Sequence, residues 1–137
     1  MKVLVTTDCS DNALKAVKRA LDLAEKEDAK VTIMSVALYP SSEFDDLPLS
    51  IQKKLDADAK DAIAKAKTIF DKKGIAVDTA LETGIVPANN IIRKAKEGKF
   101  DLVLMGSTGA TGLTKVLMGS TASKVVTHAP CSVSVVR

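Results

Sequence analysis

The sequence predicts an α/β protein, a single doubly wound domain spanning residues 1–137. We expect a five-stranded, mainly parallel sheet in the order 3-2-1-4-5, with helices on both faces. One pattern in the sequence leads to this prediction. Short apolar runs, typical of strands buried on both faces, alternate along the chain with segments of helical periodicity. Such alternation requires right-handed crossovers, which build a parallel sheet.

The first elements follow from apolar spacing and capping residues. The run KVLVT at 2–6 predicts the first strand. Ser10 or Asp11 can cap the helix that follows, because short polar side chains accept hydrogen bonds from unpaired amides at helix starts. The second strand is predicted at 31–38. The apolar positions of the first helix are Leu14, Val17, Leu21 and Ala24.

A polar stretch with two prolines, residues 39–50, predicts a surface loop. A long amphipathic helix then begins at Ile51, and Gly74 is expected to act as its C-terminal cap. The third strand is predicted at 75–82. Apolar residues recur at helical spacing at Ile51, Leu55, Ala59, Ala62, Ala66 and Phe70.

The remaining elements are marked by proline and glycine. Pro87 suits the first turn of a helix that Gly98 ends. The fourth strand is predicted at 101–105. A last helix follows Gly119 and stops before Pro130, and the fifth strand occupies 132–136.

Composition excludes several classes of protein. The net charge of +3 is small and only 3% of residues are aromatic, so neither a basic patch nor a base-stacking surface is indicated. Nucleic acid is therefore not an expected partner. No apolar run approaches a membrane span and the first residues lack a signal-peptide core, so we expect a cytoplasmic protein. Cys9 and Cys131 should lie at opposite edges of the sheet, too far apart for a disulfide.

Glycine and hydroxyl residues crowd one stretch, MGSTGATGLTKVLMGST, at 105–121. Gly106 follows a predicted strand, where a missing Cβ lets the backbone turn and approach a ligand. Gly119 opens a helix whose first amides are unpaired and carry the positive end of the helix dipole. With the hydroxyls of Ser120 and Thr121, this stretch predicts an anion site suited to phosphates. The alternative is an ordinary surface turn with a helix cap.

Other nucleotide and hydrolase motifs are absent from the sequence. No lysine stands where a P-loop requires it, and the segment after the first strand, TTDCSD, has no glycine for a dinucleotide fingerprint. Met105 occupies the position where a nucleophile elbow around Ser107 would need glycine.

The spacing Gly106-x2-Gly109-x9-Gly119-Ser120 resembles the phosphate signature of the ATP-binding universal stress proteins. The opening VLVTTDCSDNALKAV and the closing HAPCSVSVV resemble that family as well. The resemblance covers essentially the whole chain. It implies an adenine-nucleotide-hydrolase-like fold that binds ATP. Any Mg²⁺ or Mn²⁺ is expected to be carried on the phosphates with water ligands.

The resemblance also implies roles for particular residues. Asp8 would meet the ribose, the backbone of Val36 would meet adenine, and Met105 would pack near the nucleotide. Thr6 stands at the end of the first strand, where many members have proline. The phosphates would be held by Gly106, Gly109, Gly119, Ser120 and Thr121.

Alternatives to these roles stay open. Asp8 could cap the first helix, and Val36 could be a core residue. The sequence offers no clear general base or arginine finger, so hydrolysis is expected to be slow or absent. The protein would then act as a nucleotide-dependent signalling or stress-response module. A nucleotide-independent protein that acts through protein contacts is the alternative.

Two further expectations concern assembly and mutation. The fifth strand, SVSVV at 132–136, should lie at a sheet edge and has no lysine, proline or aspartate to block another strand. We therefore expect a homodimer through this strand, as the resemblance also implies. Valine at Gly106 or Gly119 is expected to block the phosphates while sparing the fold.

Overall fold

The computed structural model describes residues 1–39, 48–107 and 118–137. In chain order the described elements are β1 (Lys2–Thr6), α1 (Asp11–Glu27), β2 (Lys30–Leu38), α2 (Leu49–Asp71), β3 (Asp78–Gly84), α3 (Pro87–Glu97), β4 (Leu102–Gly106), α4 (Ser120–His128) and β5 (Ser132–Val136).

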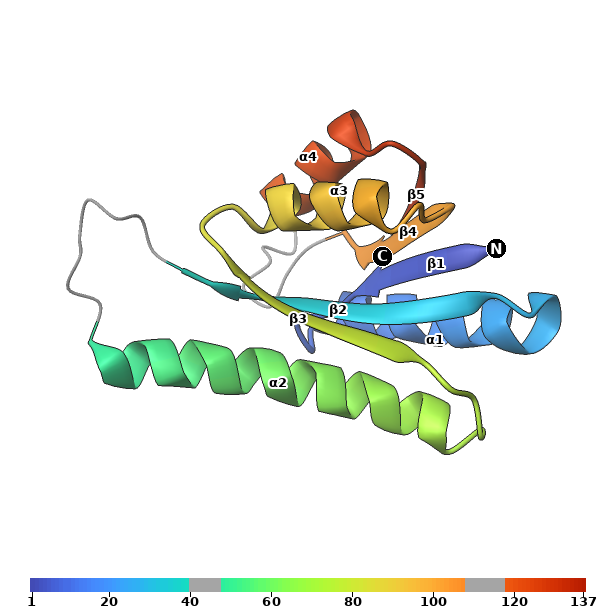
Figure 1. The fold of residues 1–137 in the computed structure, drawn as a ribbon, viewed down its shortest axis with the longest axis horizontal. Coiled ribbons are helices and arrows are strands. Elements are labelled where there is room, and N and C mark those ends of the chain that lie inside the picture. The colour runs from blue at the N-terminus through green and yellow to red at the C-terminus, as the bar shows by residue number, and fades with distance from the viewer. Residues whose placement is uncertain (40–47, 108–117) are drawn as a thin grey trace.

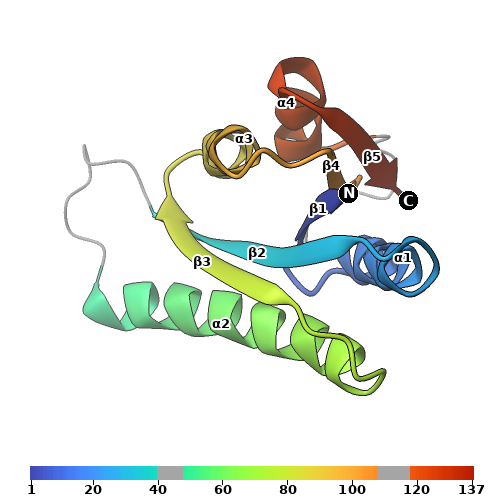
Figure 2. The same ribbon diagram turned by 45° about the vertical axis from the view of Figure 1, so that its right-hand side comes forward.

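The strands form one five-stranded sheet in the order β3-β2-β1-β4-β5, and every neighbouring pair is parallel. Helices α1 and α2 cover one face of this sheet, and α3 and α4 cover the other (Figures 1 and 2). The predicted fold class and strand order are confirmed.

Alternate residues of β1 supply the two halves of the core. Val3 and Val5 are fully buried in a cluster with residues of α1 and α2, whereas Leu4 is fully buried in a cluster with residues of α3 and α4. Successive strand side chains point to opposite faces of a sheet, so a strand covered on both faces must be apolar throughout. Burying each such side chain contributes about 1.5–3 kcal/mol.

Helix α1 begins with a side-chain cap. The Ser10 hydroxyl accepts a hydrogen bond from the Ala13 amide at 3.2 Å, and Asp11 lies in the first turn, where a carboxylate favours the helix dipole. Ser10 is therefore the capping residue of the two that the sequence allowed.

Several predicted boundaries are wrong. The third strand is Asp78–Gly84 rather than 75–82, because its pairing with β2 runs from Thr32↔Asp78 to Leu38↔Gly84. Ile75 and Val77, whose apolar character suggested a strand, instead pack partly buried against the α1–α2 side of the core.

Smaller corrections affect two other elements. Helix α2 starts at Leu49, two residues before the predicted Ile51, and ends at Asp71. Gly74, at φ +69, is the left-handed glycine that closes it, because its amide donates to the Asp71 carbonyl and the Ile75 amide donates to the Phe70 carbonyl. The predicted glycine cap is therefore confirmed. Strand β4 spans Leu102–Gly106, one residue later than predicted. Among the described helices, none is long and apolar enough to cross a membrane.

Candidate functional site

The carboxyl ends of β1 and β4 meet at one edge of the sheet. The two strands are parallel neighbours in register, with Val5 opposite Leu104, so Thr6 and Gly106 end them at the same edge. The helix after β1 covers one face of the sheet and the helix after β4 covers the other (Figure 1). This divergence makes a topological switch point, where open α/β sheets bind their ligands.

The loop from β1 to α1 is held by local hydrogen bonds. Thr7 is buried, and its amide donates to the Met34 carbonyl of β2 at 3.0 Å. Cys9 has a φ of 67°, in the left-handed region, and its amide donates to the Thr7 hydroxyl at 3.3 Å. A non-glycine residue in this region costs about 1–3 kcal/mol and persists only where the surrounding structure imposes the conformation.

Asp8 is exposed in this loop and supports its turn. One carboxylate oxygen accepts a hydrogen bond from the Ser10 amide at 2.9 Å, the arrangement of an Asx turn. The side chain that caps α1 is Ser10. Asp8 therefore precedes the helix cap, at the edge where the sequence predicted it.

Gly106 is in close contact with helix α1. A Cβ on this residue would lie 2.9 Å from the Ala13 backbone nitrogen and 3.0 Å from the Asn12 carbonyl carbon. Its φ is outside the left-handed region, so the absence of a side chain, not a special turn, is what this position requires. The expectation that valine here would spare the fold is therefore wrong, because α1 backbone would have to shift.

Ser107 connects four elements directly after β4. Its side chain is 3% exposed, and its hydroxyl accepts a hydrogen bond from the Asn12 side-chain amide of α1 at 3.1 Å. Its backbone N–H donates to the Val136 carbonyl of β5 at 2.8 Å. Its carbonyl accepts the Gly119 N–H at the start of α4, at 2.6 Å.

Sequence reasoning missed Asn12 and the structural role of Ser107. In the sequence, Ser107 was considered only as a possible nucleophile, which was excluded, and Asn12 was not singled out. Their hydrogen bond joins positions 95 residues apart, so no local pattern could have revealed it.

The start of α4 presents backbone amides of its first turn at this edge. Gly119 is the N-cap, and within the described part of the chain no side chain caps the helix. Ser120 is exposed and Thr121 is half-buried. The first amides of a helix have no intrahelical partner and carry positive potential, which favours an anion. Gly109, the middle glycine of the predicted signature, lies outside the described residues.

Val36 and Met105 are placed differently from the loop residues. Thr6 pairs with Met34, so Val36, two residues further along β2, lies beyond the paired end of β1. Val36 is half-buried, whereas Met105 is 4% exposed and belongs to the core beneath α3 and α4. The structure brings Thr6, Asp8, Gly106, Gly119 and Ser120 to the same edge, with Val36 on the adjacent strand.

Both thiols have raised pKa values and are therefore mainly protonated near neutral pH. Burial raises the pKa of the Cys9 thiol above its ordinary value of 9.0, and the ammonium of Lys65 on α2 opposes this shift. Burial also raises the pKa of Cys131, and the carboxylate of Asp101 adds to it. Both thiols are free, as predicted. A neutral thiol is a poor nucleophile and metal ligand, which argues against cysteine chemistry here.

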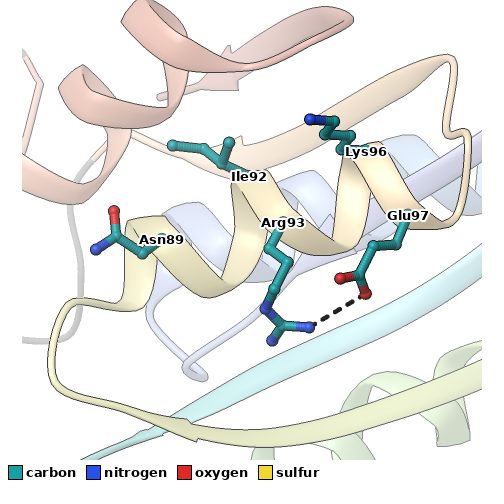
Figure 3. Close-up of a pocket in the computed structure, with 5 residues that line it drawn as sticks. All are labelled: Asn89, Ile92, Arg93, Lys96 and Glu97. Carbon is teal, nitrogen blue, oxygen red and sulfur yellow. Dashed lines mark hydrogen bonds and ion pairs between the residues drawn. The ribbon is translucent and has the colours of Figure 1, made fainter.

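A surface hollow lies on α3, apart from this edge. Figure 3 shows its described lining residues, which are Asn89, Ile92, Arg93, Lys96 and Glu97. Arg93 forms ion pairs with Glu97, at 3.3 Å, and with Glu82 of β3. The pair with Glu82 joins α3 to the outer strand, and the pair with Glu97 lies within the helix, so these charged side chains have a structural explanation. In the described ranges no group of three acidic, histidine or cysteine side chains is arranged to hold a metal.

Comparison with known proteins agrees with this architecture. The sequence profile of the universal stress protein family matches residues 1–137. A universal stress protein of Methanocaldococcus jannaschii is 36% identical over 141 residues, which cover 99% of this chain and 81% of that protein.

Solved structures give the same result. The universal stress protein UspA from Lactobacillus plantarum is 32% identical, with a TM-score of 0.82 and coverage of 100% of this chain and 97% of that one. A universal stress protein solved in complex with cAMP is 26% identical, with a TM-score of 0.74 and coverage of 100% and 97%. This chain belongs to the universal stress protein family.

Proposed function

We propose that this protein binds ATP at the carboxyl edge between β1 and β4. The observation that carries the proposal is the 2.6 Å hydrogen bond from the Gly119 amide to the Ser107 carbonyl. It joins the end of β4 to the start of α4, so the glycine-rich stretch begins and ends at one point, beside uncapped helix amides. The relative solved with cAMP supports an adenine nucleotide as the class of ligand.

In this proposal the phosphates lie at the start of α4. Amides of the first helical turn and the hydroxyls of Ser120 and Thr121 donate to phosphate oxygens, and the helix dipole stabilises their charge. Gly106 ends β4 where the glycine-rich stretch begins, and Gly109 belongs to the same glycine signature in the sequence. Mg²⁺ or Mn²⁺ would be carried on the phosphates with water ligands, because the hard oxygens of phosphate suit these ions.

The nucleoside is proposed to lie toward β2. The exposed Asp8 carboxylate accepts hydrogen bonds from ribose hydroxyls, and the half-buried Val36 offers backbone groups to adenine. Thr6 and Met105 contribute the adjoining strand ends. Asp8 already accepts the Ser10 amide, which holds the carboxylate in one orientation before the ribose arrives.

We further propose a binding module rather than an efficient hydrolase. Phosphoryl transfer depends on groups that orient the attacking water and neutralise developing charge. At the described edge the candidates are poor, since the Cys9 thiol is kept neutral by burial and Asp8 supports the loop. The bound state, rather than its turnover, would carry the stress-response signal.

A homodimer through β5 is the proposed assembly. Strand β5 is an edge strand that pairs with β4 alone in the sheet, and Val133 and Val135 are only half-buried. An edge strand without guarding charges favours pairing with a second strand, and a two-fold axis would place its own copy there.

Mass spectrometry of nucleotide released from the purified, denatured protein tests the proposal. ATP, or ADP derived from it, should appear in near-stoichiometric amount, or be taken up when the empty protein is incubated with ATP and Mg²⁺. Protein that neither releases nor takes up any nucleotide would favour the nucleotide-independent alternative.

A further inference from the structure

We propose that Asn12 and Ser107 are positioning residues for the phosphate end of the site. The inference rests on the proposed nucleotide function and deepens it. Neither side chain needs to touch ATP. Together they fix the position of the Ser107 carbonyl, which accepts a hydrogen bond from the amide of Gly119, the N-cap of α4. In this way they set where the phosphate-binding amides lie.

Ser107 lies in a buried position next to α1. Ser107 is 3% exposed, and the Asn12 amide donates to its hydroxyl at 3.1 Å. A hydrogen bond removed from such a site leaves a polar group without solvent to replace its partner. The side chain of Ser107 is therefore held in one orientation as long as Asn12 is present.

Helix α1 lies very close to the end of β4. At Gly106 the gap between strand and helix is too narrow for a Cβ, which would lie 2.9 Å from the Ala13 nitrogen. Backbone contact fixes the distance between the two elements at this point. The bond from Asn12 to Ser107 adds a directional contact, because it joins the first turn of the helix to the residue after Gly106.

The backbone of Ser107 also bonds to β5 and to the start of α4. The Ser107 carbonyl accepts the Gly119 amide at 2.6 Å, and its own amide donates to Val136 at 2.8 Å. The N–H and the C=O belong to the two peptide groups that flank the Ser107 Cα, so a shift of this one residue would change both bonds. The position of α4, where the phosphates are proposed to bind, thus depends on the position of α1 through Ser107.

The test uses Asn12→Ala, Ser107→Ala and the double variant, with ATP affinity measured by calorimetry. Each single variant should weaken ATP about fivefold, the usual effect of one hydrogen bond. The double variant should be no weaker than either single variant, because both changes remove the same interaction. Ser35→Ala, which removes a hydroxyl of similar burial in β2, should leave affinity unchanged.

A second measurement does not depend on ATP. Amide hydrogen exchange in the nucleotide-free protein should quicken about tenfold at Gly119 in both single variants, as expected for a locally loosened hydrogen bond. The Thr7 amide, which donates to Met34, should be unaffected and serves as the internal reference. This arm tests the inference even if the parent fails to bind ATP, which would overturn the proposed function alone.

Two outcomes would overturn the positioning role. The first is additive loss of affinity in the double variant, which would mean that the two residues act independently. The second is equal acceleration of exchange at Gly119 and Thr7, which would mean that the variants only lower global stability.

Discussion

The backbone nitrogen of Gly119 lies 2.6 Å from the carbonyl oxygen of Ser107, although twelve positions separate them in the sequence. This bond ties the start of α4 to the end of β4. It places uncapped helix amides at the edge of the sheet where β1 ends and the loop that carries Asp8 begins. The candidate phosphate and ribose groups therefore share one edge.

Gly106→Ala should destabilise the protein more than Gly84→Ala, by about 1–3 kcal/mol, the range for overpacking. At Gly106 the added Cβ meets Ala13 backbone at 2.9 Å, which cannot move without α1. At Gly84 it meets the tip of the Asn90 side chain at 2.0 Å, and a side chain can turn away. Urea unfolding of both variants measures the difference, and equal losses would contradict the packing argument.

Cys9→Gly should stabilise the folded protein or leave it unchanged, whereas Cys9→Val should destabilise it by roughly 1–2 kcal/mol. The reason is the φ of 67° at Cys9, which glycine adopts freely and a β-branched residue resists. Thermal and urea unfolding report both effects. A more stable valine variant would show that the thiol's contacts, not the backbone, dominate at this position.

Cys9 should react slowly with iodoacetamide at neutral pH, because burial raises its pKa and the thiolate is the reactive form. Lys65→Ala removes the charge that lowers this pKa. The pKa then rises further, and alkylation should slow by about twofold, as expected for an exposed charge. Peptide mass spectrometry separates Cys9 from Cys131, whose rate should not change.

Lys67→Ala is the matched control for that experiment. Lys67 pairs with Asp71 on the same helix at 3.1 Å, as Lys65 pairs with Asp61 at 3.0 Å, but its charge does not act on Cys9. Equal slowing in both variants would contradict the assigned role of Lys65.

Val135→Pro should convert the proposed dimer to a monomer. The Val136 carbonyl accepts the Ser107 amide, so the backbone groups of Val136 point toward β4 and those of Val135 point toward the open edge. Proline at Val135 thus removes an amide from the edge without removing one from the β4 pairing. Sedimentation should show twice the chain mass for the parent and the chain mass for the variant.

Val136→Pro is the control for strand integrity, because it removes an amide that faces β4 and should lower the melting temperature more. A parent that sediments as a monomer at tens of micromolar would end the dimer proposal.

The fold was predictable because its strongest signals are local. The uninterrupted apolar run at Val3, Leu4 and Val5 predicted a strand buried on both faces, and the structure confirms it. The third strand was misplaced because Ile75 and Val77 are apolar for packing in a connection, while the strand itself carries polar residues to Gly84. An edge strand need not be apolar throughout.

The site was predictable only in part. Glycine spacing indicated where β4 gives way to α4, but the sequence suggested ligand approach as the reason for Gly106, where the structure shows helix packing. The bond from Asn12 to Ser107 depends on tertiary contact between distant segments and leaves no local pattern.

Calorimetric titration with ATP and Mg²⁺ tests the central claim most directly. The parent should bind with micromolar affinity, about −8 kcal/mol. Gly119→Val should bind no ATP while keeping its melting temperature within a few degrees, because φ −71° and ψ 169° at this N-cap are open to valine. Absence of binding in the parent, or undiminished binding in the folded valine variant, would contradict a phosphate site at the start of α4.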